Sequence, residues 1–150
     1  MRKNVERMRY QNDSLPFWLC IIGIVFNIVY FIGIYRSREL APDVTFGVDV
    51  VYNIVFMLIT FLASEKTKTY ARGWPFVLFL LGAIQALRVL WIPARFLALE
   101  QLTRPGYWKA FAALIASGAS LVAAGSVSLL HAAMLRRFLS RLNPADPSEE

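Results

Sequence analysis

Five amide or charged side chains stand inside otherwise apolar segments of this chain: Asn27, Asp49, Asn53, Gln85 and Arg88. In hydrocarbon, each of them costs free energy unless it faces protein or water. Such residues can form a site that binds an ion or a small polar solute, or they can hold neighbouring helices together by hydrogen bonds. These five residues are therefore the candidate intramembrane polar site.

The sequence gives little support for catalysis. It contains neither an HExxH nor a GxSxG motif, and its apolar segments hold a single aspartate, whereas an intramembrane aspartyl protease needs two. Cys20 is the one cysteine, so we expect a small buried hydrophobe, with no disulfide or thiolate metal site within the chain. His131 is expected to lie at the membrane interface. The prediction is a protein that is not an enzyme and that holds no metal or cofactor.

The elements that position these residues are four apolar blocks, at about 15–35, 44–63, 74–94 and 110–131. Of the 150 residues, 57% are hydrophobic and 17% are charged, which is more apolar than a soluble domain. As a helix, the first block would rise ~31 Å, enough to cross the hydrocarbon core. The sequence therefore predicts an all-α integral membrane protein, a four-transmembrane-helix bundle over residues 15–133. Pro93 predicts a kink in the third helix, and Arg104-Pro105-Gly106 is expected to end it.

Depth and helical phase bring the five polar residues together. Measured along each helix from its cytoplasmic end, Asn27, Asn53 and Gln85 lie ~15–18 Å deep, and Asp49 and Arg88 both lie ~21 Å deep. Asp49 and Asn53 are four residues apart on one helix face, and Gln85 and Arg88 are three apart on another. We therefore expect an internal polar layer in which Asp49 and Arg88 form an ion pair. The alternative is that Arg88 extends to one interface while Asp49 is solvated separately among headgroups.

Small residues recur every fourth position along the last block. They form a candidate helix-packing face that consists of Ala112, Ala116, Ser120, Ala124 and Ser128. Small side chains let two helix backbones approach closely, which favours helix association in lipid. The sequence leaves open whether the partner helix belongs to this bundle or to another subunit.

Basic residues set the expected orientation. If the N-terminus is cytoplasmic, ten lysines and arginines fall on the cytoplasmic side, in 1–14, 64–73 and 134–150, and five fall outside. This bias favours both termini inside, as the tryptophans near the predicted interfaces also do. We expect a basic cytoplasmic N-terminus at 1–14, kept as part of a retained signal anchor, and a disordered cytoplasmic tail at 134–150. The formal charge of +6 lies in these flanks, which favours contact with anionic headgroups rather than with nucleic acid.

Two segments of the chain resemble each other. Residues 25–30 read VFNIVY and residues 51–56 read VYNIVF. Successive helices cross in opposite directions, so the match could be a relic of an inverted repeat, as in some transporters. Coincidence within the restricted alphabet of membrane helices is the other explanation, and the sequence does not decide between them.

Two functions fit these features. The first is a non-enzymatic subunit, or an assembly or regulatory factor, of a larger membrane complex, which contacts a protein partner or another copy through its transmembrane helices. The second is a homo-oligomeric transporter or channel for an ion or small solute, with the polar layer as its site. The compact form and the charge bias suggest a bacterial cytoplasmic membrane.

Overall fold

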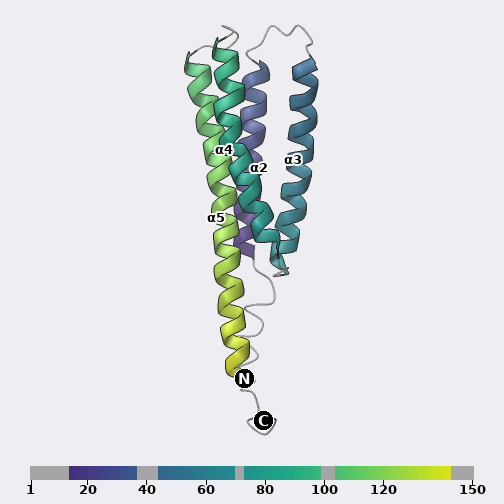
Figure 1. The fold of residues 1–150 in the computed structure, drawn as a ribbon, viewed down its shortest axis with the longest axis vertical. Coiled ribbons are helices and arrows are strands. Elements are labelled where there is room, and N and C mark those ends of the chain that lie inside the picture. Colours follow the sequence, from purple (N-terminus) through teal and green to yellow (C-terminus); the bar gives the residue numbers. More distant parts are fainter. Residues whose placement is uncertain (1–13, 37–43, 70–72, 99–103, 143–150) are drawn as a thin grey trace.

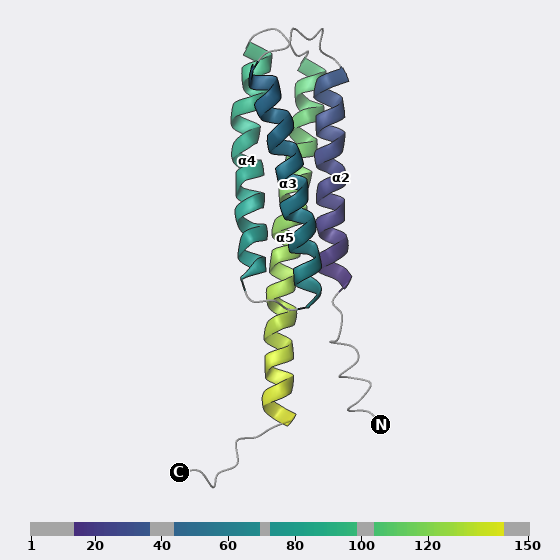
Figure 2. The same cartoon turned by 90° about the vertical axis from the view of Figure 1, so that its right-hand side faces the viewer.

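A computed structural model describes residues 14–36, 44–69, 73–98 and 104–142. This part of the chain forms helices α2 (Ser14–Arg36), α3 (Val44–Lys68), α4 (Trp74–Ala98) and α5 (Arg104–Leu142). Each helix runs antiparallel to the next in an elongated bundle (Figures 1 and 2). α3 packs between α2 and α4, and α5 closes the ring by packing against both of them. α5 also has the largest share of the packing, whereas the α3–α4 interface is the smallest of the four.

The turn that leads into α4 depends on Gly73. Its φ angle is +97°, in the region that favours glycine. Its carbonyl oxygen accepts hydrogen bonds from the backbone N–H groups of Phe76 and Val77, at 3.1 and 3.3 Å. Pro75 occupies the first turn, where its missing N–H leaves no hydrogen bond unmade. α4 can therefore begin close after the end of α3.

Both ends of α5 differ from the sequence prediction. The motif Arg104-Pro105-Gly106 was expected to end the third helix, but α4 ends at Ala98 and the motif forms the first turn of α5. Proline is favoured in a first helical turn, and this explains the difference. Residues 134–142 were expected to be disordered, yet α5 continues to Leu142. This segment is rich in leucine and arginine and contains no glycine or proline, so the helix has no local reason to stop.

Within the described residues, three helices are long and apolar enough to cross a membrane, over Ser14–Tyr35, Gly47–Lys68 and Arg104–Phe138. The corresponding apolar stretch of α4 is shorter, at Trp74–Leu90. Pro93 lies inside α4, which continues to Ala98, and the predicted kink stays a prediction. The predicted tails at 1–13 and 143–150 lie outside the described residues.

The bundle is apolar on its outside and holds a polar layer within. Large apolar side chains face outward on all four helices; Val48, Val51 and Leu58 of α3 are 64%, 61% and 58% exposed. Inside, one apolar cluster surrounds Cys20, Phe56 and Leu121, and another contains Tyr30, Ile34, Val89 and Leu114. Cys20 is fully buried, as predicted. The polar side chains of the candidate site are buried as well.

Candidate functional site

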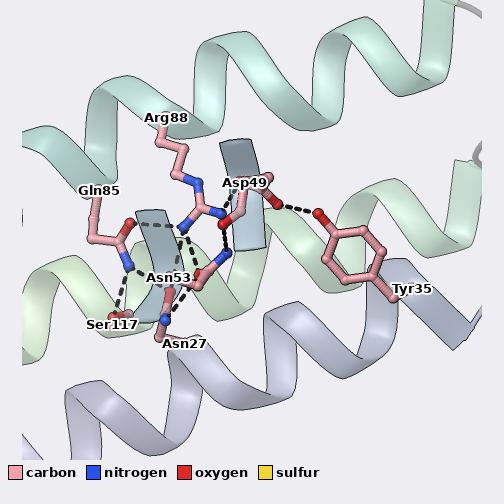
Figure 3. A network of polar contacts seen from close by, with 7 residues as sticks. All are labelled: Asn27, Tyr35, Asp49, Asn53, Gln85, Arg88 and Ser117. Atoms are coloured by element: carbon pink, nitrogen blue, oxygen red, sulfur yellow. Dashed lines mark hydrogen bonds and ion pairs between the residues drawn. The ribbon is translucent and has the colours of Figure 1, made fainter. Parts of the chain in front are cut away.

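All four helices contribute buried polar side chains to one connected network (Figure 3). Asn27 comes from α2, Asp49 and Asn53 from α3, and Gln85 and Arg88 from α4. Each of these five side chains is at most 6% exposed. The structure therefore brings together the five residues from which the sequence predicted an internal polar layer.

The centre of the network is an ion pair between α3 and α4. The Nη2 group of Arg88 contacts Oδ1 of Asp49, and both side chains are 4% exposed. The hydroxyl of Tyr35, at the end of α2, donates a hydrogen bond to the other carboxylate oxygen, Oδ2. Both oxygens of Asp49 thus have donors, and the two opposite charges balance each other inside the bundle.

Amide side chains complete the network around the other terminal nitrogen of Arg88. Nη1 donates to Oδ1 of Asn53 at 3.0 Å, and it lies 3.5 Å from the amide oxygens of Asn27 and Gln85. Asn27 donates to the same oxygen of Asn53 at 3.1 Å, while Asn53 donates to the backbone carbonyl of Asp49 at 2.7 Å. These bonds link α2, α3 and α4 across the centre of the bundle.

Gln85 extends the network to α5. Its Nε2 donates to Oδ1 of Asn27 at 2.8 Å and lies 3.4 Å from the hydroxyl oxygen of Ser117. Ser117 in turn donates to the backbone carbonyl of Gly23 at 2.8 Å. Ser117 is fully buried, so its hydroxyl connects α5 to α2 without contact with solvent.

Two tyrosines that the sequence analysis did not assign to the site lie against the guanidinium of Arg88. Its Cζ atom is 4.7 Å from the ring centre of Tyr30 and 4.5 Å from that of Tyr52, distances typical of cation–π contacts. A sequence signal for both did exist. Tyr30 follows Asn27 by three residues, and Tyr52 follows Asp49 by three, so each shares a helix face with a predicted site residue.

The candidate helix-packing face does not form a single face. Ala124 and Ser128 are buried, but Ala116 and Ser120 are half-buried and Ala112 is exposed. A step of four residues overshoots one helical turn by roughly 40°, so a four-residue repeat winds around the helix. The inward face instead contains Ala113, Ser117, Leu121, Ala124 and Ser128.

Glycines make the closest contact between α4 and α5. A Cβ atom at Gly82 would lie 3.0 Å from the carbonyl oxygen of Gly118, and one at Gly118 would lie 3.1 Å from that of Gly82. A Cβ atom at Gly125 would lie 3.0 Å from the carbonyl oxygen of Pro75. At these positions a Cβ atom would be in tight contact with the backbone of the facing segment, so the glycines permit the close helix approach that was expected of small residues.

The two similar segments have nearly the same burial pattern. Asn27 and Asn53 hold equivalent positions, are both buried and hydrogen bond to each other. Tyr30 and Phe56 are also equivalent and buried, whereas the isoleucines and valines of both segments face outward. The similarity therefore places one amide from each helix at the same point of the core.

Comparisons with known proteins add no family. No protein-family model matches the chain, and searches of curated proteins and of solved structures found no significant match. Among the described residues, no three His, Cys, Asp or Glu side chains lie together in a group that could hold a metal ion. The groups that this site offers for binding are the ion pair, the amides and the tyrosine side chains.

Proposed function

We propose that this chain is a multi-pass integral membrane protein in which all four helices cross the bilayer. The outward-facing valines, leucines and phenylalanines support this proposal, because such a surface matches lipid and not water. The buried network supports it as well, since intramembrane charges face the protein interior and pair there. The proposed compartment is a bacterial cytoplasmic membrane.

The proposed orientation has both termini in the cytoplasm. The N-terminal end of α2 and the C-terminal ends of α3 and α5 lie toward the same end of the bundle (Figure 2). Basic residues gather at this end, where Lys66 and Lys68 stand in the last turn of α3 and Arg136 and Arg137 are exposed on α5. An excess of lysine and arginine favours the cytoplasmic side.

Within that membrane, the proposed role is a non-enzymatic subunit, or an assembly or regulatory factor, of a larger complex. One observation carries this proposal: the buried charges and amides bind each other across all four helices. Their hydrogen bonds hold the bundle together, and this use requires no substrate. A bundle fixed in this way can present a constant outer surface to a partner.

The outer face of α5 is the proposed docking surface for that partner. Small residues recur along it with helical periodicity, at Ala112, Ala116, Ala119, Ala123 and Ser126. Ala112 and Ala119 are exposed, and the other three are half-buried. Such a face lets a second transmembrane helix approach closely, with Ile115 and Val122 as flanking apolar contacts.

Co-purification from the native membrane tests this role. The wild-type protein, extracted in mild detergent, should retain a larger partner in fixed proportion, identified by mass spectrometry. Ala119→Leu should reduce the retained partner several-fold while the melting temperature stays unchanged, because the added bulk faces outward. Ala83→Leu on the exposed side of α4 is the matched control and should retain the partner. Equal retention of the partner by both variants would show that the docking surface does not lie on the outer face of α5.

Transport is the second candidate, and the hydroxyls of Tyr30 and Tyr52 favour it. Both are buried beside Arg88 without a hydrogen-bond partner, as is its Nε atom. Free hydrogen-bonding groups at a charged intramembrane site are a feature of solute pathways. This function predicts a homo-oligomer without a larger partner, and ion or solute flux in proteoliposomes that Arg88→Leu abolishes.

A further inference from the structure

The tyrosine-flanked side of Arg88 contains hydrogen-bonding capacity that the protein itself does not use. The guanidinium of Arg88 contacts the rings of both Tyr30 and Tyr52. Each of these three residues has one buried polar atom without a hydrogen-bond partner: Tyr30 Oη, Tyr52 Oη and Arg88 Nε. They come from α2, α3 and α4. A buried polar atom without a hydrogen bond costs about 1–3 kcal/mol. Three such atoms around one guanidinium are therefore the most costly unsatisfied cluster in the described part of the chain.

The chemistry of these atoms restricts what could bind them. Nε–H is a donor only, and each tyrosine hydroxyl can donate or accept, so the ligand must accept hydrogen bonds. The charge of Arg88 is already balanced by Asp49. An added anion would leave a net negative charge in an apolar interior, which is unfavourable. A cation would be repelled by the positive charge of the guanidinium. A small neutral ligand meets all of these conditions.

We infer that Tyr30, Tyr52 and Arg88 form a binding site for a small neutral hydrogen-bond acceptor, of which water is the simplest. The guanidinium, held from its far side by Asp49 and Asn53, presents Nε toward the ligand, and the two tyrosines bind the ligand from neighbouring helices. This site is separate from the α5 docking surface and does not depend on the proposed subunit role.

Polar contacts continue from Arg88 toward the C-terminal end of α2. Asp49 contacts Arg88 on one side and Tyr35 on the other (Figure 3). Tyr35 is half-buried and is the penultimate residue of α2.

Removing the hydroxyls one at a time tests the site, because the melting temperature changes in opposite directions for an occupied and an empty site. If the hydroxyls bind a ligand, Tyr30→Phe and Tyr52→Phe in the purified full-length protein should each lower the melting temperature by about 2–4 °C. In the double variant, the melting temperature should fall by less than the sum of the two single decreases, since both hydroxyls bind the same ligand. Tyr107→Phe is the control, because Tyr107 packs against Phe111 outside the polar layer. It should leave the melting temperature within about 1 °C of the wild type.

An empty site gives the reverse result. Deleting a hydroxyl that has no partner removes a desolvation cost, so both phenylalanine variants would then melt at or above the wild-type temperature. That outcome overturns the proposal. Where the melting temperature falls, the Nε–H proton of Arg88, followed by NMR in micelles, identifies the ligand. Exchange or cross-relaxation with water supports water, and its absence supports a lipid-soluble carbonyl compound at the same atoms.

Discussion

Arg88 is the residue on which the largest number of buried interactions depends. It contacts Asp49, Asn53, Tyr30 and Tyr52, and its Nη1 atom lies near the amide oxygens of Asn27 and Gln85. Loss of its charge would therefore affect three helices at once. Asp49 differs, because its carboxylate keeps the hydrogen bond from Tyr35 when Arg88 is removed. The two ends of the ion pair are consequently not equivalent.

The first prediction at this scale concerns that difference. Arg88→Leu and Asp49→Leu should each lower the free energy of unfolding by about 3–5 kcal/mol, because each leaves an uncompensated buried charge. Asp49→Leu should be the more damaging, since a guanidinium cannot lose its charge, whereas a carboxylate can take up a proton. The double replacement should recover much of the loss. Thermal unfolding of the four proteins in detergent gives the coupling energy directly.

Asp49→Asn is the matched control for side-chain shape. It removes the charge but keeps an oxygen that can accept a hydrogen bond from Tyr35 or Arg88. Its free energy of unfolding should therefore lie between those of the wild type and Asp49→Leu. A coupling energy of zero in the double-mutant cycle would mean that the two charges are stabilised independently.

Among the helices, α3 depends most on polar contacts. Its inward face carries the buried polar residues Asp49, Asn53, Thr60, Ser64 and Thr67, and its outward face carries exposed valines and leucines. The hydroxyls of Ser64 and Thr67 donate to backbone carbonyls one turn earlier in α3, so their hydrogen-bond partners lie within their own helix. Asp49 and Asn53, by contrast, bind residues of other helices. The smallest interface of the bundle, between α3 and α4, thus contains its one buried ion pair among the described residues.

Helix phase explains how much of this arrangement the sequence could predict. Asn27, Asp49, Asn53, Gln85 and Arg88 are rare polar residues in apolar segments, so depth and phase alone placed them together. Tyr30, Tyr35 and Tyr52 were missed because tyrosine is also common at membrane interfaces, and its sequence position does not show which end points inward. The Arg104-Pro105-Gly106 motif was misassigned because proline and glycine occur at helix starts as well as at helix ends. The small residues that recur every four positions from Ala112 to Ser128 do not form one helix face, because an α-helix has 3.6 residues per turn.

The second prediction tests the close approach of α4 and α5. Gly82→Ala should lower the free energy of unfolding by about 1–3 kcal/mol, because its Cβ atom would lie 2.8 Å from Cγ2 of Val122 and 3.0 Å from the backbone of Gly118. Gly47→Ala is the matched control, since a Cβ atom there meets nothing within 4 Å. It should leave stability unchanged or raise it by about 0.5–1 kcal/mol, through helix propensity. Thermal unfolding in detergent measures both, and equal effects would show that the α4–α5 contact tolerates a methyl group.

Considered as a whole, the molecule is polar in its middle and apolar outside, and α5 is longer than the bundle. Its 39 residues would rise ~58 Å, about twice the hydrocarbon thickness. Figures 1 and 2 show its C-terminal part projecting beyond the ends of the other helices. Arg136 and Arg137 are exposed in the C-terminal part of α5, and Lys66 and Lys68 stand in the last turn of α3. Among the described residues, five lysines and arginines lie toward this end of the bundle and four toward the other, so the ten-to-five bias of the whole sequence depends mainly on residues 1–13.

The last prediction follows from that asymmetry and from the proposed crossing of the membrane by every helix. In a Cys20→Ala background, single cysteines are introduced at Lys66, at Ser140 and at Thr103, and intact cells are treated with a membrane-impermeant thiol reagent. Cys20 is buried, so its replacement does not change the surface. Thr103→Cys, in the connection between α4 and α5, should be labelled. Lys66→Cys and Ser140→Cys, both at exposed positions, should be labelled only after the membrane is permeabilised. The reverse pattern would place the basic end outside and overturn the orientation. Labelling of all three in intact cells would mean that no membrane separates the two ends, and the bundle would then not span the bilayer.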